Sequence, residues 1–198
     1  MKKIIVINAS PRRNKNTGEV SQYILEKIDY MSFQTSDEII IEYLDLKQMD
    51  FIGCIDCGYC QKHKGCSIKD DLHNIYEQFD NSCATIIITP VYFDGTPWKL
   101  KALVDRMQAI YNSKYILNDS LIKRDKLRRG MLISIGGAPV YETQFTGNQL
   151  VMNFMFKSIN TNFEKHLKVS GTDEISAIKN QYILDEIDNF LMEVILEV

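Results

Sequence analysis

Short apolar runs that resemble buried strands alternate along this chain with segments that repeat apolar residues at helical spacing. The strand-like runs cover residues 3–8, 39–46, 84–89, 131–135 and, more weakly, 162–169. They are too short for most helices and rich in β-branched residues, which is typical of strands buried on both faces. Because helical segments separate them, the sequence predicts an α/β fold: a doubly wound five-stranded parallel sheet in a three-layer α/β/α sandwich.

Helical periodicity fills the intervals between these strands. The apolar stripes cover residues 20–31, 72–79, 100–107, 148–159 and 183–194. Asp70 or Asp71 is expected to open the second helix, and Thr96 with Pro97 is expected to open the third as cap and first-turn proline. Asn16 and Glu19 have the spacing of a capping box at the start of the first helix.

Composition and charge narrow the class of protein. The 198 residues are 45% hydrophobic and show no linker, so we expect a single domain over residues 1–198. The first apolar run, residues 4–7, is too short for a signal peptide, and no window approaches the roughly 20 apolar residues of a membrane span. The formal net charge of -3 gives no general attraction to nucleic acid or acidic lipid. The sequence therefore predicts a cytoplasmic protein with no nucleic-acid or membrane partner.

Four of the five cysteines lie in one cysteine-rich loop, residues 53–69, after the second strand. They are Cys54, Cys57, Cys60 and Cys66, in the stretch CIDCGYCQKHKGC. In a reducing compartment, cysteines this close together more often hold a metal or carry out redox chemistry than form permanent disulfides. The spacing alone therefore predicts either a metal site or a redox thiol site.

Three loops follow predicted strands and should meet at the carboxyl edge of the sheet, where doubly wound folds bind ligands. Residues 8–18 combine hydroxyl, amide and basic side chains before a helix N-terminus, which favours a phosphate. A well-capped helix after a polar turn is the alternative. Residues 89–98 carry Tyr92, Phe93 and Trp98 beside two prolines, and Gly136 with Gly137 follows the fourth strand. Core packing and a plain turn are the alternatives there, but together the loops predict a pocket for a phosphorylated planar cofactor.

The segments NASPRRNKNT, CIDCGYCQKHKGCSIKDDL and TPVYFDGTPWKLKALVDR, in this order, resemble the NADPH-dependent FMN reductase branch of the flavodoxin-like flavoproteins. Within that branch the chain is most similar to the iron-sulfur flavoproteins. The resemblance extends over roughly residues 3–137. It implies a flavodoxin-like sheet, non-covalent FMN, and electron transfer in which the flavin carries the chemistry, so that no catalytic side chain is required.

By resemblance, the residues of the FMN phosphate loop are Ser10, Arg12, Asn14, Asn16 and Thr17. Those that contact the isoalloxazine ring are Pro90, Val91, Tyr92, Phe93 and Asp94, and Gly136 and Gly137 meet the other side of the flavin. The family often has glycine where this chain has Asp94. A carboxylate there would either disfavour an anionic reduced ring or point to solvent.

The resemblance also implies that Cys54, Cys57, Cys60 and Cys66 bind a [4Fe–4S] cluster. A four-cysteine zinc site and an empty or thiol-redox site are the alternatives. The expected function is an oxidoreductase, an iron-sulfur flavoprotein that moves electrons between a low-potential donor, NAD(P)H or a ferredoxin-like protein, and a small-molecule or protein acceptor. It is expected to form a homodimer or homotetramer. The alternatives are an FMN-only NAD(P)H-dependent FMN or quinone reductase with structural cysteines, and a non-enzymatic metal or redox sensor.

Two further features have less specific interpretations. Basic residues outnumber acidic ones in the connector before the fourth strand: Lys114, Lys123, Arg124, Lys126, Arg128 and Arg129. This stretch is expected to be a solvated connector rather than a site for a nicotinamide phosphate or an acidic partner. His73 and His166 lie on patterned segments and are expected at the surface or in caps.

Overall fold

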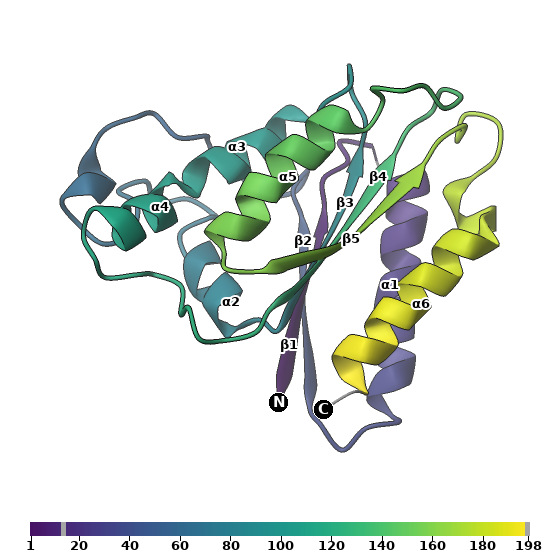
Figure 1. The fold of residues 1–198 in the computed structure, drawn as a ribbon, viewed down its shortest axis with the longest axis horizontal. Coiled ribbons are helices and arrows are strands. Elements are labelled where there is room, and N and C mark those ends of the chain that lie inside the picture. The colour runs from purple at the N-terminus through teal and green to yellow at the C-terminus, as the bar shows by residue number, and fades with distance from the viewer. Residues whose placement is uncertain (13–14, 197–198) are drawn as a thin grey trace.

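A computed structural model describes residues 1–12 and 15–196, and within them five parallel strands form a sheet in the order β2-β1-β3-β4-β5 (Figure 1). The strands are β1 (Lys2–Asn8), β2 (Ile39–Asp45), β3 (Ala84–Pro90), β4 (Arg129–Ile135) and β5 (Asn162–Val169). All neighbouring pairs are parallel. This is the flavodoxin-like strand order, with a switch point between β1 and β3, and it confirms the predicted fold.

Helices cover both faces of the sheet. They are α1 (Asn16–Ser32), α2 (Ile75–Asn81), α3 (Trp98–Arg106), α4 (Gln108–Tyr115), α5 (Thr146–Ser158) and α6 (Gln181–Ile195), with short 3-10 turns η1 (Tyr59–Gln61) and η2 (Ala177–Lys179). Figure 1 shows α1 and α6 side by side on one face and the remaining helices on the other. The cysteine-rich loop with η1 extends beyond α4, away from the carboxyl ends of the strands.

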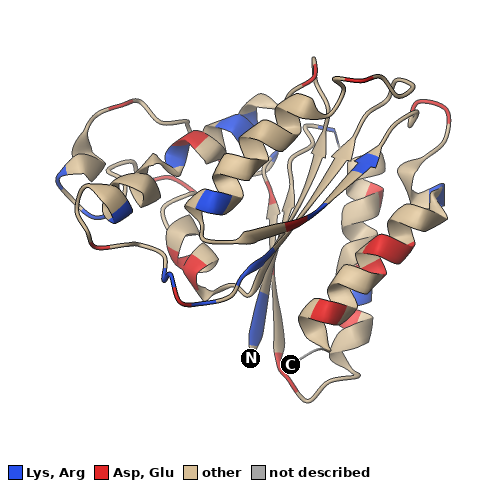
Figure 2. Ribbon diagram, in the orientation of Figure 1, with Lys and Arg blue, Asp and Glu red and all other residues tan. Residues whose placement is uncertain are grey.

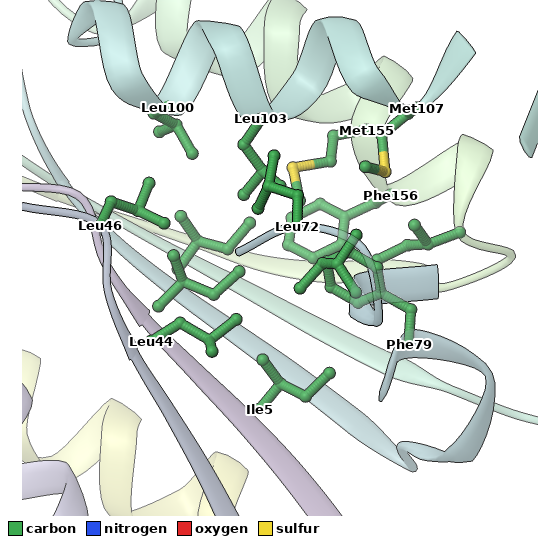
Figure 3. Close-up of a cluster of buried hydrophobic side chains, with 14 of the residues drawn as sticks. Ile5, Leu44, Leu46, Leu72, Phe79, Leu100, Leu103, Met107, Met155 and Phe156 are labelled. Atoms are coloured by element: carbon green, nitrogen blue, oxygen red, sulfur yellow. The ribbon is translucent and has the colours of Figure 1, made fainter. Parts of the chain in front are cut away.

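Successive side chains along each strand point to opposite faces of the sheet, and they form two separate hydrophobic cores. On β1, Ile4 and Val6 pack with α1 and α6, whereas Ile5 and Ile7 face the opposite helices. Figure 3 shows Ile5 and Leu44 on the sheet side of that second core, with Leu100 and Leu103 of α3 on its helix side. Complete burial of such a side chain stabilises the fold by about 1.5–3 kcal/mol. Burial on both faces explains why these strands read as continuous apolar runs.

Several helix boundaries differ from the sequence prediction. α2 begins at Ile75, after a turn over residues 71–74. α3 begins at Trp98 with Pro97 as its cap and no capping side-chain bond, so Thr96 does not have the predicted role. α4 follows α3 directly, and the apolar pattern did not separate the two helices. Lys15 is the cap residue of α1, so the predicted capping box is not formed.

The connector before β4 is more buried than predicted. Arg128 is 1% exposed, and its guanidinium bonds the carbonyl of Phe79 at 3.1 Å and the carboxylate of Asp80 at 2.7 Å. Lys114 is also buried, and its ammonium bonds Asn160 Oδ1 at 2.6 Å. These contacts hold the connector against α2 and the end of α5. The interpretation as a solvated connector is therefore wrong for Arg128 and Lys114.

Charged residues are spread over several elements in Figure 2, with acidic positions along α6 and basic ones at the start of β1, on α3 and α5, and before β4. None of the helices formed by residues 1–12 and 15–196 combines the length and apolar character that crossing a membrane requires.

Candidate functional site

The loop after β1 is folded by its own side chains. Asn8 Oδ1 accepts a hydrogen bond from the Ser10 amide at 3.0 Å, and Ser10 Oγ accepts one from the Arg12 amide at 3.1 Å. These two successive turns bring the chain across the end of β1 to the start of α1. Lys15, the cap residue, makes no side-chain capping bond at that helix end, so the first amides of α1 and its dipole favour an anion.

Asn16 and Thr17, both predicted in the phosphate loop, begin α1, and their side chains point to different surroundings. Asn16 turns its side chain toward the loop after β5, where it donates to Thr172 O at 3.2 Å and accepts from the Ala177 amide at 2.8 Å. Its contribution to a ligand would therefore come from its backbone. Thr17 is buried and lines the cavity described below. Asn14 lies outside the described residues.

The loop after β3 contains a tight two-residue turn. Tyr92 and Gly95 exchange backbone hydrogen bonds of 3.0 and 2.9 Å, and the two residues between them, Phe93 and Asp94, have φ of 47° and 58°. Positive φ at both central positions is the geometry of a type I′ turn, which favours Gly, Asn and Asp. Phe93 is fully exposed at the tip. Asp94 therefore occupies a backbone conformation that glycine would also adopt without strain, and it adds a carboxylate.

That carboxylate joins two loops. Asp94 accepts hydrogen bonds from the Tyr141 hydroxyl and from Thr143 Oγ1, the latter at 2.8 Å; we call these three residues the Asp94 clasp. The two hydroxyl donors lower the pKa of Asp94 and keep it ionised. The clasp connects the turn after β3 to the segment that leads into α5. The side chain thus has protein partners, rather than pointing freely to solvent.

Close packing fixes the glycines of this edge. A Cβ on Gly136 would lie 2.5 Å from Gln144 Nε2, and one on Gly137 would lie 2.6 Å from the carboxylate oxygens of Asp173. At the start of α5, a Cβ on Gly147 would lie 2.1 Å from the carbonyl oxygen of Asp94. Glycine is needed at Gly147, where the neighbour is backbone, whereas at Gly136 and Gly137 the neighbours are side-chain ends that would have to move.

The strand-end loops enclose one cavity of about 480 Å³, within the range of small-molecule sites. Of the predicted residues, it is lined by Ser10, Arg12, Asn16, Thr17, Pro90, Val91, Tyr92 and Gly137. Phe93, Asp94 and Gly136 do not line it. A second cavity of about 300 Å³ shares Ser10 and Tyr92 with the first and is bordered by Trp98. One side is thus polar and suited to an anion, and the other is aromatic and suited to a flat ring, which fits a phosphorylated planar cofactor.

Sequence reasoning missed the fourth wall of this site. The loop after β5 contributes Thr172, Asp173, Glu174, Ser176 and Lys179 to the larger cavity. Thr172 Oγ1 bonds Gly136 O at 3.1 Å, and Ser176 donates to Glu19 of α1. The β5 pattern was weak and this loop carries no recognised motif. The signal available in the sequence was its position, since it follows the last strand of the sheet and so ends at the same edge.

All four clustered cysteines line a separate cavity. Its other walls include Arg106 at the end of α3, and Gln108, Ala109 and Asn112 on α4. Asn112 Nδ2 donates to Cys60 Sγ at 3.0 Å, and Cys57 Sγ lies 3.4 Å from Ser67 Oγ. The contact with Ser67 lowers the pKa of Cys57. The sequence prediction that these cysteines gather at one place is consistent with this shared cavity.

The chain reaches this arrangement through residues with left-handed backbone. Gly58 and Gly65 have φ of 70° and 92°, and Asp56 has φ of 50°. Among residues 1–12 and 15–196, no three His, Cys, Asp or Glu side chains are arranged to hold a single metal ion. The cysteines thus surround a common space without converging on one point.

A buried ion pair closes the base of the cysteine-rich loop. The Arg106 guanidinium bonds both carboxylate oxygens of Asp70, at 2.7 and 3.2 Å, and the carbonyls of Ile52 and Ile68, at 3.1 and 3.3 Å. Ile52 and Ile68 flank the cysteines, so one side chain fastens both ends of the loop. Burial alone would raise the pKa of Asp70, but Arg106 and backbone amides lower it below its usual value.

Comparison with known proteins shows the family. A family model described as NADPH-dependent FMN reductase matches residues 2–148, about three quarters of the chain. The chain belongs to this family. It is accordingly an FMN-dependent oxidoreductase, and its redox chemistry takes place on a flavin.

Curated relatives agree with the family. An iron-sulfur flavoprotein of Archaeoglobus fulgidus is 29% identical over 156 residues, which cover 79% of this chain and 73% of the relative. One of Methanosarcina thermophila is 29% identical over 136 residues, covering 69% of this chain and 64% of the relative. An FMN-dependent NADH-azoreductase of Bacillus anthracis, solved with FMN, is similar in fold, with a TM-score of 0.70, 19% identity and coverage of 98% and 100%.

His166 of the reductase differs from its predicted surface position. Its Nε2 lies 3.0 Å from Ser134 Oγ, which also accepts from Asn148 Nδ2 at 3.2 Å. Burial lowers the pKa of His166 to about 4, so the ring is neutral at pH 7. This polar cluster lies behind the glycine edge and supports the end of β4.

Proposed function

We propose that the FMN phosphate binds at the start of α1, between the loops after β1 and β5. Ser10, Arg12 and Thr17 line this end of the cavity, and Asn16 contributes its backbone amide. The uncapped helix end and the Arg12 cation both favour a doubly charged phosphate. Asn14, from the same loop, completes the proposed set by family resemblance.

The isoalloxazine ring is proposed to lie against Pro90, Val91 and Tyr92, with Gly137 on the opposite side. When bound, FMN supplies electron and hydride transfer, and the protein positions and tunes it. Tyr92 and Trp98 offer flat apolar surfaces next to the phosphate cradle. Asp94 and Gly136 are proposed to hold the ring-contacting loops in place, through the Asp94 clasp and the packing of Gln144. Phe93, exposed at the tip of its turn, is proposed to reach the ring only when FMN is bound.

We further propose that Cys54, Cys57, Cys60 and Cys66 bind a [4Fe–4S] cluster. Four thiolates around one cavity suit such a centre, whose cysteine sulfurs are farther apart than those around one ion. A tetrahedral zinc site would require the four sulfurs to converge about 2.3 Å from one point. The described side chains include no group of three possible ligands arranged in that way. Arg106, which lines the cavity and is paired with Asp70, has an unpartnered Nε–H that also suits an anionic cluster.

The cluster and the flavin would form a two-centre electron carrier. NAD(P)H or a ferredoxin-like protein is the proposed donor, and a quinone or another small-molecule or protein carrier the acceptor. The two cavities share no lining residue. We therefore propose a homodimer or homotetramer, built from single domains of residues 1–198 in the cytoplasm, in which the cluster of one subunit approaches the flavin of another. A monomer by light scattering would contradict this assembly.

The observation that carries the proposal is the meeting of the strand-end loops at one cavity, with the four cysteines at a second. The test is anaerobic purification followed by absorption spectroscopy and by iron and sulfide analysis. We expect flavin bands, about one FMN per chain, and about four iron and four sulfide per chain. Flavin without iron or sulfide would refute the cluster but keep the FMN site, and absence of flavin with no binding of added FMN would refute both.

An FMN-only NAD(P)H-dependent reductase is the second candidate, because the matching family is described by its flavin reaction and not by a metal. It predicts that Cys57→Ala leaves turnover with NAD(P)H and a small acceptor unchanged. The electron-transfer proposal predicts that the same substitution removes iron and stops transfer to a one-electron acceptor while FMN stays bound.

A further inference from the structure

The wall of the cysteine cavity formed by α4 carries a buried amide directed at a sulfur atom. Asn112 is 2% exposed, and its Nδ2 donates to Cys60 Sγ at 3.0 Å, the shortest of the contacts made by the four cysteine sulfurs in the described chain. Asn112 lies inside α4, so a buried helix side chain, and not the loop itself, supplies this donor.

A thiolate at Cys60 can only accept, so it requires the nitrogen of this amide, and not the oxygen, to face it. Gln108 Nε2 donates to Asn112 Oδ1 at 3.0 Å, which agrees with that orientation. Because α4 places Gln108 one turn before Asn112, the two side chains lie on the same helix face. The helix thus presents an N–H donor, and not an acceptor, to the cavity.

A buried cation lies on the same wall. Arg106 is 1% exposed and lines the cavity, and its Nε has no hydrogen-bond partner among the described residues although the other guanidinium nitrogens are bonded. The acidic residue that lines the cavity, Asp56, is exposed. Because Asp70 compensates the charge of Arg106, what the buried part of the wall offers an anionic group is N–H donors, from Asn112 and from Arg106 Nε.

We propose that Asn112 is a positioning residue for the iron-sulfur centre and raises its reduction potential through Cys60; this rests on the proposed function, in which the four cysteines bind a cluster. A one-electron reduction adds negative charge to the cluster and its sulfurs. An N–H donor stabilises the more negative state more strongly, and hydrogen bonds to the sulfurs are among the factors that set these potentials. Arg106, whose charge Asp70 compensates, leaves its Nε–H as a second unpaired donor on this wall.

The test is a dithionite titration of the anaerobic holoprotein, followed by electron paramagnetic resonance for the cluster and by absorption for the flavin. Asn112→Leu keeps the size of the side chain and removes the donor. We expect the ratio of reduced to oxidised cluster at a fixed potential to fall about tenfold, a shift of about 59 mV to lower potential for one electron. The flavin potential should not change.

Asn153→Leu is the matched control, because it makes the same asparagine-to-leucine change at an exposed position of α5. Gln108→Leu is the second variant, since it frees the amide without removing it, and it should shift the cluster in the same direction by a smaller factor. An unchanged cluster potential in Asn112→Leu would overturn the proposal. If that variant loses its iron, an unchanged potential in Gln108→Leu would overturn it.

The iron and sulfide content of the wild-type protein tests the proposed cluster separately from the role of Asn112. Wild-type protein with FMN but without iron or sulfide would refute the cluster itself, and this role of Asn112 with it. Wild-type protein with a cluster whose potential is the same in both variants would refute only the role of Asn112.

Discussion

Replacing Asp70 by asparagine should destabilise the fold far more than an ordinary surface substitution. The Arg106 and Asp70 side chains are 1% and 12% exposed and form a two-pronged pair. Asparagine has the same shape but leaves the buried guanidinium without a counter-charge. Asp70 also accepts bonds from the amides of Ile52 and Leu72, at 3.3 and 3.1 Å, so the carboxylate organises both sides of the cysteine-rich loop.

The magnitude follows from the burial of this pair. Removing one partner of a buried ion pair costs about 3–5 kcal/mol, because a charge is left without compensation. In the double variant Asp70→Asn with Arg106→Met neither charge remains, so the loss should be smaller than the sum of the single losses by about 2 kcal/mol. Asp105→Asn is the control: it breaks an exposed pair with Lys101 of 2.6 Å and should cost at most about 1 kcal/mol.

The pH dependence has a defined sign. The pKa of Asp70 is lowered in the folded protein, so its stabilising contribution is present above the usual aspartate pKa and is lost as pH falls through the folded value. Wild-type protein should therefore lose stability in acid more steeply than Asp70→Asn.

Urea unfolding followed by circular dichroism measures these losses, and hydrogen exchange over residues 52–72 locates them. Exchange should increase first in the cysteine-rich loop, because its two ends are fastened by this pair. An Asp70→Asn variant within about 1 kcal/mol of wild type, with unchanged protection of the loop, would refute the reasoning.

Three further results are expected. Gly147→Ala should destabilise the protein by about 1–3 kcal/mol in urea unfolding, because its Cβ would overlap the carbonyl of Asp94, whereas Gly18→Ala, with open space around its Cβ, should be neutral or stabilising. His166→Gln should flatten the stability profile between pH 6.5 and pH 4: the folded pKa of about 4 lies below the usual 6.5, so wild type loses about 3 kcal/mol as pH falls through this window. An equal slope in both proteins would contradict this. Thr17→Val should weaken FMN binding about tenfold in fluorescence titrations without changing the unfolding midpoint, through loss of one charge-assisted hydrogen bond.

The strand order and layers could be predicted because burial on both faces leaves a continuous apolar signature, and because right-handed crossovers restrict the topology. β5 agrees with its predicted span to the residue. Helix boundaries were less predictable. α3 and α4 are separated by a single residue, Met107, whose φ and ψ of -68° and -7° a hydrophobic pattern does not reveal. The start of α2 depends on Asp70, which is engaged with Arg106 far along the chain.

For the site, local motifs identified the loops after β1, β3 and β4 and the four cysteines, but not the hydrogen bonds that individual side chains make there. Asn16 lines the cavity as predicted, but its side-chain amide connects α1 to the loop after β5, which its local motif does not reveal. Arg106 lies in an apolar helical stripe and gave no signal, because its partners are 36 to 54 residues away in sequence. His166 was expected at the surface for the same reason, since its neighbours come from β4 and α5. Long-range polar pairing of this kind is not encoded in the spacing of residues.

The left-handed turn at Asp94 has a consequence for how this family can vary. Glycine and aspartate both tolerate this backbone conformation, and their codons differ only in the second base. A single nucleotide change can therefore add or remove the tie to Tyr141 and Thr143 without a change in loop length or backbone path. A substitution at this codon would change how firmly the turn after β3 is held to the segment before α5.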